Sequence, residues 1–132
     1  MARPASRYPT ELELQVLQIL WESGESSVMS VRDALAEQCD RDIARTSVVT
    51  TLNVMTNKGL VFRRQQGRAY LFTHAVTQED TSKGMLGDLI DRVFDGSAVA
   101  LLLNLLDSER VDEDEHRALR RLINRKRRGK NK

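Results

Sequence analysis

The chain has 132 residues, of which 40% are hydrophobic and 30% charged, and its formal net charge is +2. This composition excludes wholesale disorder and predicts one domain, or a small domain with an appendage. No apolar run approaches the ~18 residues of a membrane span, and no signal-peptide core opens the sequence. The single cysteine, Cys39, excludes an intramolecular disulfide and a cysteine-cluster metal site. We therefore expect a cytoplasmic protein.

The charges are strongly segregated along the sequence. Residues 41–75 carry six basic side chains and one acidic, whereas residues 1–40 carry three basic and seven acidic. Between Asp42 and Glu79, 36 consecutive residues have no carboxylate, where 19 acidic residues in 132 would place about five. Such an absence of carboxylates is expected for a surface that binds a polyanion, because each carboxylate there would repel phosphate.

Two helices are predicted in the first 40 residues. Thr10 and Glu13 form a capping-box pattern, so the first helix should begin after Thr10 and end at Gly24. A second, short helix should begin at Ser30, with Asp33 three residues later, and end near the polar run 39–42. The apolar positions of the first helix are Leu12, Leu14, Val16, Leu17, Ile19, Leu20 and Trp21.

A third helix is predicted over residues 45–58, capped by Gly59. Its inner face contains Val48, Thr51, Leu52 and Met55. The outer face has no acid and carries threonine and asparagine, which are poor helix formers, so something other than helix stability selects them. We interpret it as a DNA major-groove face, with Asn53 on adenine; the alternative is a polar face exposed to water. Its other members are Thr46, Thr50 and Asn57. Near the start of the helix, Arg45, Thr46 and Ser47 are candidates for phosphate contacts.

A basic hairpin should follow, with strands over 60–64 and 69–73 joined through 65–68. We expect Leu60, Phe62, Tyr70 and Phe72 to share one face. Arg63, Arg64 and Arg68 should gather towards the tip, where they would contact phosphate or the minor groove, unless they serve only solubility. Three helices and this hairpin predict a mainly α fold that begins with a winged helix-turn-helix domain, residues 1–75.

Residues 76–124 are predicted to form a helical dimerisation domain. Thr77, Ser97 and Asp112 are expected caps, and the helix after Ser97 is apolar nearly all round, which requires enclosure. A lone core of this size is marginal, so a second copy should supply the cover. The basic segment 125–132 is expected to be a disordered tail or to add nonspecific DNA affinity. The expected dimerisation residues are Leu86, Leu89, Ile90, Val93, Leu101, Leu102, Leu105, Leu106, Leu119, Leu122 and Ile123.

Several segments resemble the BlaI/MecI penicillinase-repressor family over about residues 8–124. They are ELE at 11–13 with LWE at 20–22, IARTSVVTTLN at 43–53, KGL at 58–60 and GRAY at 67–70. The resemblance implies a homodimeric winged-helix repressor of antibiotic-resistance or copper-homeostasis genes that binds palindromic operators. It also implies base- or phosphate-contacting roles for Thr46, Ser47, Val49, Thr50 and Asn53. Arg45 and Val54 depart from the family pattern, and the cysteines of the copper-responsive branch are absent.

The resemblance further implies regulation by proteolysis. The segment Leu103-Asn104-Leu105 resembles the site where a membrane-bound sensor protease, or a peptidase that it activates, cuts the family's dimerisation helix. Read from the residues alone, Asn104 is a polar residue that sets the register of a helix interface. A buried helix must also open before a protease can bind it.

No set of residues predicts catalysis, a metal or a cofactor. The sequence has no nucleophile–base pairing, carboxylate pair or phosphate-cradling glycine loop, and its two histidines are isolated, so we do not expect an enzyme. The expected partners are double-stranded operator DNA and a second copy of the chain. Two alternatives remain open: a winged-helix module that binds an acidic protein, and a regulator that responds to a small molecule.

Overall fold

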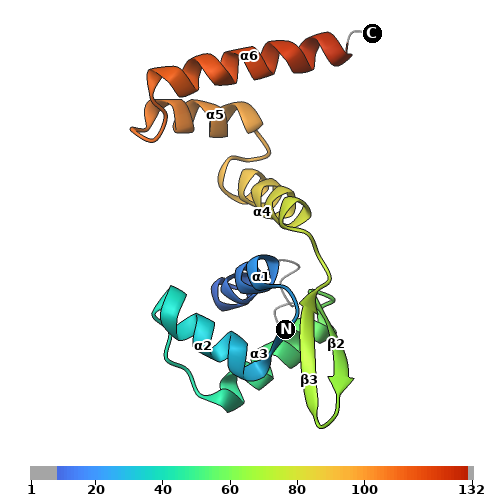
Figure 1. Ribbon diagram of the computed structural model, residues 1–132. Coiled ribbons are helices and arrows are strands. Elements are labelled where there is room, and N and C mark those ends of the chain that lie inside the picture. Colours follow the sequence, from blue (N-terminus) through green and yellow to red (C-terminus); the bar gives the residue numbers. More distant parts are fainter. Residues whose placement is uncertain (1–8, 131–132) are drawn as a thin grey trace, which may run out of the picture. The chain divides into compact units, whose positions relative to one another are not determined.

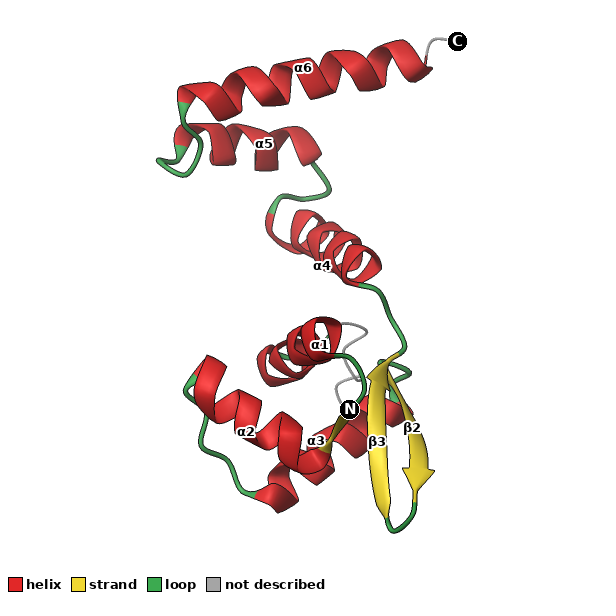
Figure 2. Cartoon of the chain, viewed as in Figure 1, coloured by secondary structure: helices red, strands yellow, loops and turns green. Residues whose placement is uncertain are grey.

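The computed structural model describes residues 9–130 as six helices and three short strands (Figures 1 and 2). The chain divides into two compact units, one that extends to Met85 and one that begins at Leu86, so the division falls inside a helix rather than between residues 75 and 76. The elements are α1 (Glu11–Ser23), β1 (Ser26–Ser27), α2 (Val28–Cys39), α3 (Arg45–Asn57), β2 (Val61–Gln66), β3 (Ala69–His74), α4 (Gln78–Val93), α5 (Ala98–Asp107) and α6 (Glu113–Lys130).

The N-terminal unit is a winged helix-turn-helix, as the sequence predicts. Helices α1, α2 and α3 pack together, and β1, β3 and β2 form an antiparallel sheet in that order. The indole Nε1 of Trp21 donates a hydrogen bond of 3.0 Å to the carbonyl of Val76, which fixes the chain after β3 to α1. The core is built by Val16, Leu17, Ile19, Leu20, Val31, Leu35, Val48, Leu52, Met55, Leu60, Val61 and Phe72.

The helix starts follow local capping chemistry. Thr10 Oγ1 accepts from the backbone N–H of Glu13, and the Glu13 carboxylate accepts from the N–H of Thr10, so the predicted capping box is present. Thr77 accepts from the N–H of Asp80, and Ser97 caps α5 through the N–H of Ala100. These starts are confirmed because each depends on residues three positions apart.

The predicted start of the second helix is wrong. Helix α2 begins at Val28, with Ser27 as its N-cap, and Ser27 Oγ accepts from the backbone N–H of Ser30 at 3.1 Å. Ser30 is therefore inside the helix. The reason is non-local: Ser26 and Ser27 pair with Phe72 and Leu71 of β3, which ends the extended backbone at Ser27.

The predicted face of the hairpin is also wrong. Residues 65 and 66 continue β2, so the turn contains only Gly67 and Arg68, and Arg63 pairs with Phe72 while Phe62 pairs with Thr73. Directly opposed residues share a face of the sheet. Phe62 therefore points away from Phe72, and it is 64% exposed. Gly67, at φ +62°, takes the left-handed position that a two-residue hairpin turn requires.

A partly buried ion pair joins α1 to the end of α3. The Nζ atom of Lys58 lies 2.9 and 3.1 Å from the two carboxylate oxygens of Glu13. The Glu13 side chain is only 5% exposed and that of Lys58 21%. The same carboxylate completes the capping box, so one acid fixes the start of α1 and the position of α3.

The C-terminal unit contains the second half of α4, together with α5 and α6. From residue 86 to residue 129 no side chain is buried. The basic segment does not form a separate tail over residues 125–130, because α6 continues through them to Lys130; Asn131 and Lys132 lie outside the described residues. Within residues 9–130, no helix is both long enough and apolar enough to cross a membrane.

Candidate nucleic-acid interface

The exposed face of α3 is polar and lacks carboxylates. Thr46, Thr50, Asn53 and Asn57 are all exposed, as expected for the outer face. Of the predicted inner residues, Val48, Leu52 and Met55 are buried, whereas Thr51 is only half-buried. The hydroxyl of Thr50 donates to the carbonyl of Thr46 at 2.9 Å. This bond satisfies the hydroxyl hydrogen locally, so the threonine methyl and the amide N–H groups of Asn53 and Asn57 remain for an external partner.

The N-terminus of α3 has no internal anion. Ala44 is the N-cap, no side chain accepts from the first-turn N–H groups, and the first turn has no acidic residue. The orphan N–H groups and the positive end of the helix dipole therefore remain uncompensated. This end of the helix suits a phosphate, and Arg45 follows the cap directly.

Arg63 connects the hairpin to α3. Its guanidinium carbon lies 4.7 Å from the centre of the Tyr70 ring, in cation–π geometry. Its Nη1 donates to Oδ1 of Asn53 at 3.3 Å. Tyr70 and Asn53 thus hold Arg63 beside the outer face of α3. A ligand bound to that face would contact the Arg63 guanidinium.

A groove of about 400 Å³ lies between α3, the start of α2 and the hairpin. Of the residues that the sequence predicts to bind DNA, the structure brings together Arg45, Val49, Asn53, Arg63 and Arg68 around it. We call it the α3–wing groove. Thr46, Ser47, Thr50 and Asn57 lie along α3 outside it. The lining residues are Ser27, Val28, Met29, Arg45, Val49, Asn53, Arg63, Arg68, Ala69, Tyr70 and Phe72.

Arg64 does not join the groove. Strand β1 lies on the other side of β3 from β2, which brings Glu25 across the sheet to Arg64. The guanidinium donates to both carboxylate oxygens of Glu25, at 2.6 and 2.7 Å. These hydrogen bonds lower the pKa of Glu25 below its ordinary value.

Acids outside the 43–78 segment neutralise half of the basic residues in 41–75. Arg41, Lys58 and Arg64 pair with Glu11, Glu13 and Glu25, all from the first 25 residues. Within residues 9–130, no carboxylate pairs with the other three. Those three, Arg45, Arg63 and Arg68, all line the α3–wing groove, so the uncompensated positive charge of this segment is concentrated there.

The sequence did not single out Tyr70 or Met29 as groove residues. Tyr70 was expected in the apolar face of the hairpin, but it lies diagonally across from Arg63 and stacks on it. The alternation of side chains along β3 places Tyr70 on the same face as Phe72. Only the pairing register shows that Arg63 also lies on that face. No local pattern identifies Met29, because its position depends on the actual start of α2.

Replacing Arg64 with alanine should raise the pKa of Glu25 towards its ordinary value. Because the folded-state pKa is lowered, the pair stabilises the fold above the carboxyl's ordinary pKa of about 4.3. That contribution is lost as the pH falls through the lowered value. An NMR titration of the Glu25 carboxyl carbon measures the change. Lys83→Ala, which removes the exposed partner of Glu79, is the control and should leave Glu25 unaffected; an unchanged pKa in Arg64→Ala would contradict the pairing.

Comparisons with known proteins place the chain in a family. Residues 9–125 match the penicillinase repressor family. The transcriptional regulator BlaI of Mycobacterium tuberculosis is 33% identical over 86% of this chain and 80% of its own length. The methicillin resistance regulatory protein MecI of Mammaliicoccus sciuri is 24% identical over 86% of this chain and 91% of its own length.

A solved structure shows a similar fold over almost the whole chain. The structure of RosR from H. salinarum has a TM-score of 0.53 and 14% identity, covering 95% of this chain and 99% of that chain. Identity at this level indicates the fold alone. The sequence match to repressors over residues 9–125 decides the classification: the chain belongs to the penicillinase repressor family.

Proposed function

We propose that the chain is a homodimeric transcriptional repressor that binds palindromic operator DNA through the α3–wing groove. One observation carries the proposal: the three basic residues of 41–75 without a carboxylate partner among the described residues all line one groove beside the uncapped start of α3. Helix α3 reads base edges in the major groove, and Arg63 and Arg68 contact the backbone or the minor groove.

The relatives support the regulatory part of this proposal. The curated relatives include proteins named MecI, BlaI and, from Bacillus licheniformis, penicillinase repressor. Because the chain belongs to the penicillinase repressor family, we infer that it regulates genes of β-lactam resistance or of a related stress response. Repression follows from occupancy of promoter DNA.

The exposed apolar surface of the C-terminal unit supports dimerisation. Leu122 and Ile123 of α6 are 50% and 49% exposed, and no residue from 86 to 129 is buried in the single chain. A soluble monomer rarely leaves so many large apolar side chains open. A second copy with the same surface covers them by two-fold symmetry. The other exposed apolar residues of this unit are Leu86, Leu89, Val93, Val99, Leu102, Leu103 and Leu105.

Relief of repression by proteolysis fits the position of Asn104. Asn104 and Leu105 are exposed in the single chain and lie within α5. A cut between them separates α6 from the rest of the chain and removes apolar surface that the dimer uses. Because a protease binds extended backbone, α5 must first unfold locally, and a sensor protease or a peptidase that it activates would exploit that opening.

Two substitutions in the groove should have different effects on DNA binding. Arg68→Ala should weaken binding to all sequences and lower the salt dependence of log K by up to about one unit, because it removes a phosphate contact. Asn53→Ala should relax discrimination at one base pair, at a cost of about 1–3 kcal/mol. Gel-shift titrations against operator and single-base variants measure both effects.

The control is Arg92→Ala, which removes an exposed arginine already paired with Asp88 on α4. Arg92→Ala should change neither the salt dependence of log K nor the discrimination between base pairs. If Asn53→Ala keeps the base preference intact, α3 does not read that base and the assignment of the recognition helix fails. If genomic DNA does not compete for the wild-type protein at physiological salt, the repressor proposal itself fails.

A further inference from the structure

Helix α6 carries the second carboxylate-free segment of the chain. Its acids, Glu113, Asp114 and Glu115, all belong to the first turn. From residue 116 onwards there is no carboxylate, although residues 117–130 include six arginines and two lysines. The acids stabilise the positive end of the helix dipole and the cap, so they do not neutralise the rest of the helix.

The arginines share one side of the helix. At about 100° per residue, the six arginines span about 160°, and Leu119, Leu122 and Ile123 lie on the opposite side. Lys126 falls among the apolar positions, as does position 130. Arginine and lysine are thus sorted between the two sides of α6. The arginine face consists of Arg117, Arg120, Arg121, Arg125, Arg127 and Arg128.

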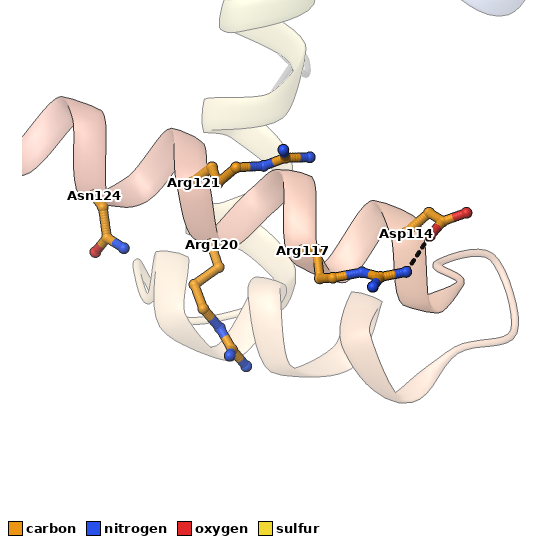
Figure 3. Close-up of a pocket in the computed structure, with 5 residues that line it drawn as sticks. All are labelled: Asp114, Arg117, Arg120, Arg121 and Asn124. Atoms are coloured by element: carbon orange, nitrogen blue, oxygen red, sulfur yellow. Dashed lines mark hydrogen bonds and ion pairs between the residues drawn. The ribbon is translucent and has the colours of Figure 1, made fainter.

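The structure leaves most of this face unpaired. Figure 3 shows Arg117 turned towards Asp114, with which it forms an ion pair, while Arg120 and Arg121 extend away from that pair in different directions. Among the described residues, neither Arg120 nor Arg121 has an ion-pair partner. Together with Asn124 these side chains line a shallow hollow of about 490 Å³.

The chemistry of the face indicates phosphate as its ligand. Guanidinium groups bind phosphate oxygens through paired hydrogen bonds, which the lysine ammonium cannot do. The face extends from residue 117 to residue 128, about 16 Å of helix. A DNA strand presents one phosphate for about every 3.4 Å of duplex axis, so this length follows several consecutive phosphates.

We propose that the arginine face of α6 is a second, sequence-independent binding site for the sugar–phosphate backbone of double-stranded DNA. The inference rests on the proposed function, because it assumes that the chain binds operator DNA, and it assigns a contact outside the α3–wing groove. An anionic membrane fits less well. A membrane-surface helix inserts its apolar side, and that side here carries Lys126 and provides Leu122 and Ile123 to the proposed dimer.

The test compares two double variants that remove the same charge. Arg120→Gln/Arg121→Gln alters the arginine face, and Lys126→Gln/Lys130→Gln alters the apolar side. Glutamine is a good helix former, so α6 should persist, which circular dichroism checks. Fluorescence anisotropy over a salt series measures binding to an operator duplex with long random flanks on both sides. The flanks provide phosphates wherever the second site meets the DNA.

We expect the arginine variant to lower the salt slope of log K by up to about two units while base preference stays the same. The lysine variant should change the slope by less than half of that. Equal slopes in the two variants would overturn the inference and leave the proposed function standing. If the wild-type protein fails to bind the operator, both fail. Loss of binding to phosphatidylserine vesicles in the arginine variant, with an unchanged DNA slope, would identify a membrane ligand and overturn the inference.

Discussion

Replacing Leu122 and Ile123 together with glutamate should abolish dimerisation and reduce operator affinity by about 100- to 10,000-fold. When two half-site contacts are joined in one dimer, the second contact forms at a high effective concentration, and its loss removes an advantage of about that size. The two side chains are half-exposed in the single chain, so the monomer should tolerate the change. Sedimentation equilibrium measures the association, and anisotropy on a full palindrome measures the affinity.

The internal control is a duplex with a single half-site. The variant should lose far less affinity for it than for the palindrome, because the α3–wing groove belongs to the other unit and is unchanged. Only the repulsion between DNA and the two new carboxylates on α6 should remain. A variant that remains dimeric would show that this surface of α6 is not the interface. A variant that is monomeric yet keeps full operator affinity would remove the reason for a palindromic operator.

Local chemistry made much of the fold predictable. Thr10 with Glu13, Thr77 with Asp80 and the Ser97 cap each act over three residues, and each helix start was confirmed. The start of α2 failed for a non-local reason. Ser27 and Ser30 offer the same capping hydroxyl, and only the pairing of β1 with β3 selects Ser27. The predicted hairpin face failed for a different reason. With either a two-residue or a four-residue turn, Phe62 lies opposite an odd-numbered residue of β3, so it cannot share a face with Tyr70 and Phe72.

The candidate site was predictable as a region but not as a set of contacts. The absence of carboxylates over residues 43–78 predicted which part of the chain forms the candidate DNA-binding surface. This pattern can be recognised without a structure, because it depends only on which residue types are present. The acids that neutralise Arg64 and Lys58 lie 39 and 45 residues earlier in the chain, and only the folded structure reveals those pairs. Once the paired basic residues are excluded, the candidate phosphate-binding residues of this segment are Arg45, Arg63 and Arg68.

The Glu13–Lys58 pair should have a much larger effect on stability than its neighbours on the surface. Glu13→Ala removes the capping box and leaves the Lys58 ammonium, 21% exposed, without its carboxylate. Removing one partner of a buried pair costs about 3–5 kcal/mol, and water that reaches Lys58 reduces this. We expect the free energy of unfolding of the N-terminal unit to fall by about 3 kcal/mol. Urea denaturation measures it.

Glu11→Ala is the matched control, since it removes an acid from the same helical turn. Its pair with Arg41 is exposed at 3.7 Å and should contribute less than about 0.5 kcal/mol. Adding Lys58→Met to Glu13→Ala should recover part of the loss, because a methionine of similar length needs no charged partner. If Glu13→Ala and Glu11→Ala shift the urea midpoint equally, the Glu13–Lys58 pair does not hold α3 in place, and core packing alone must do so.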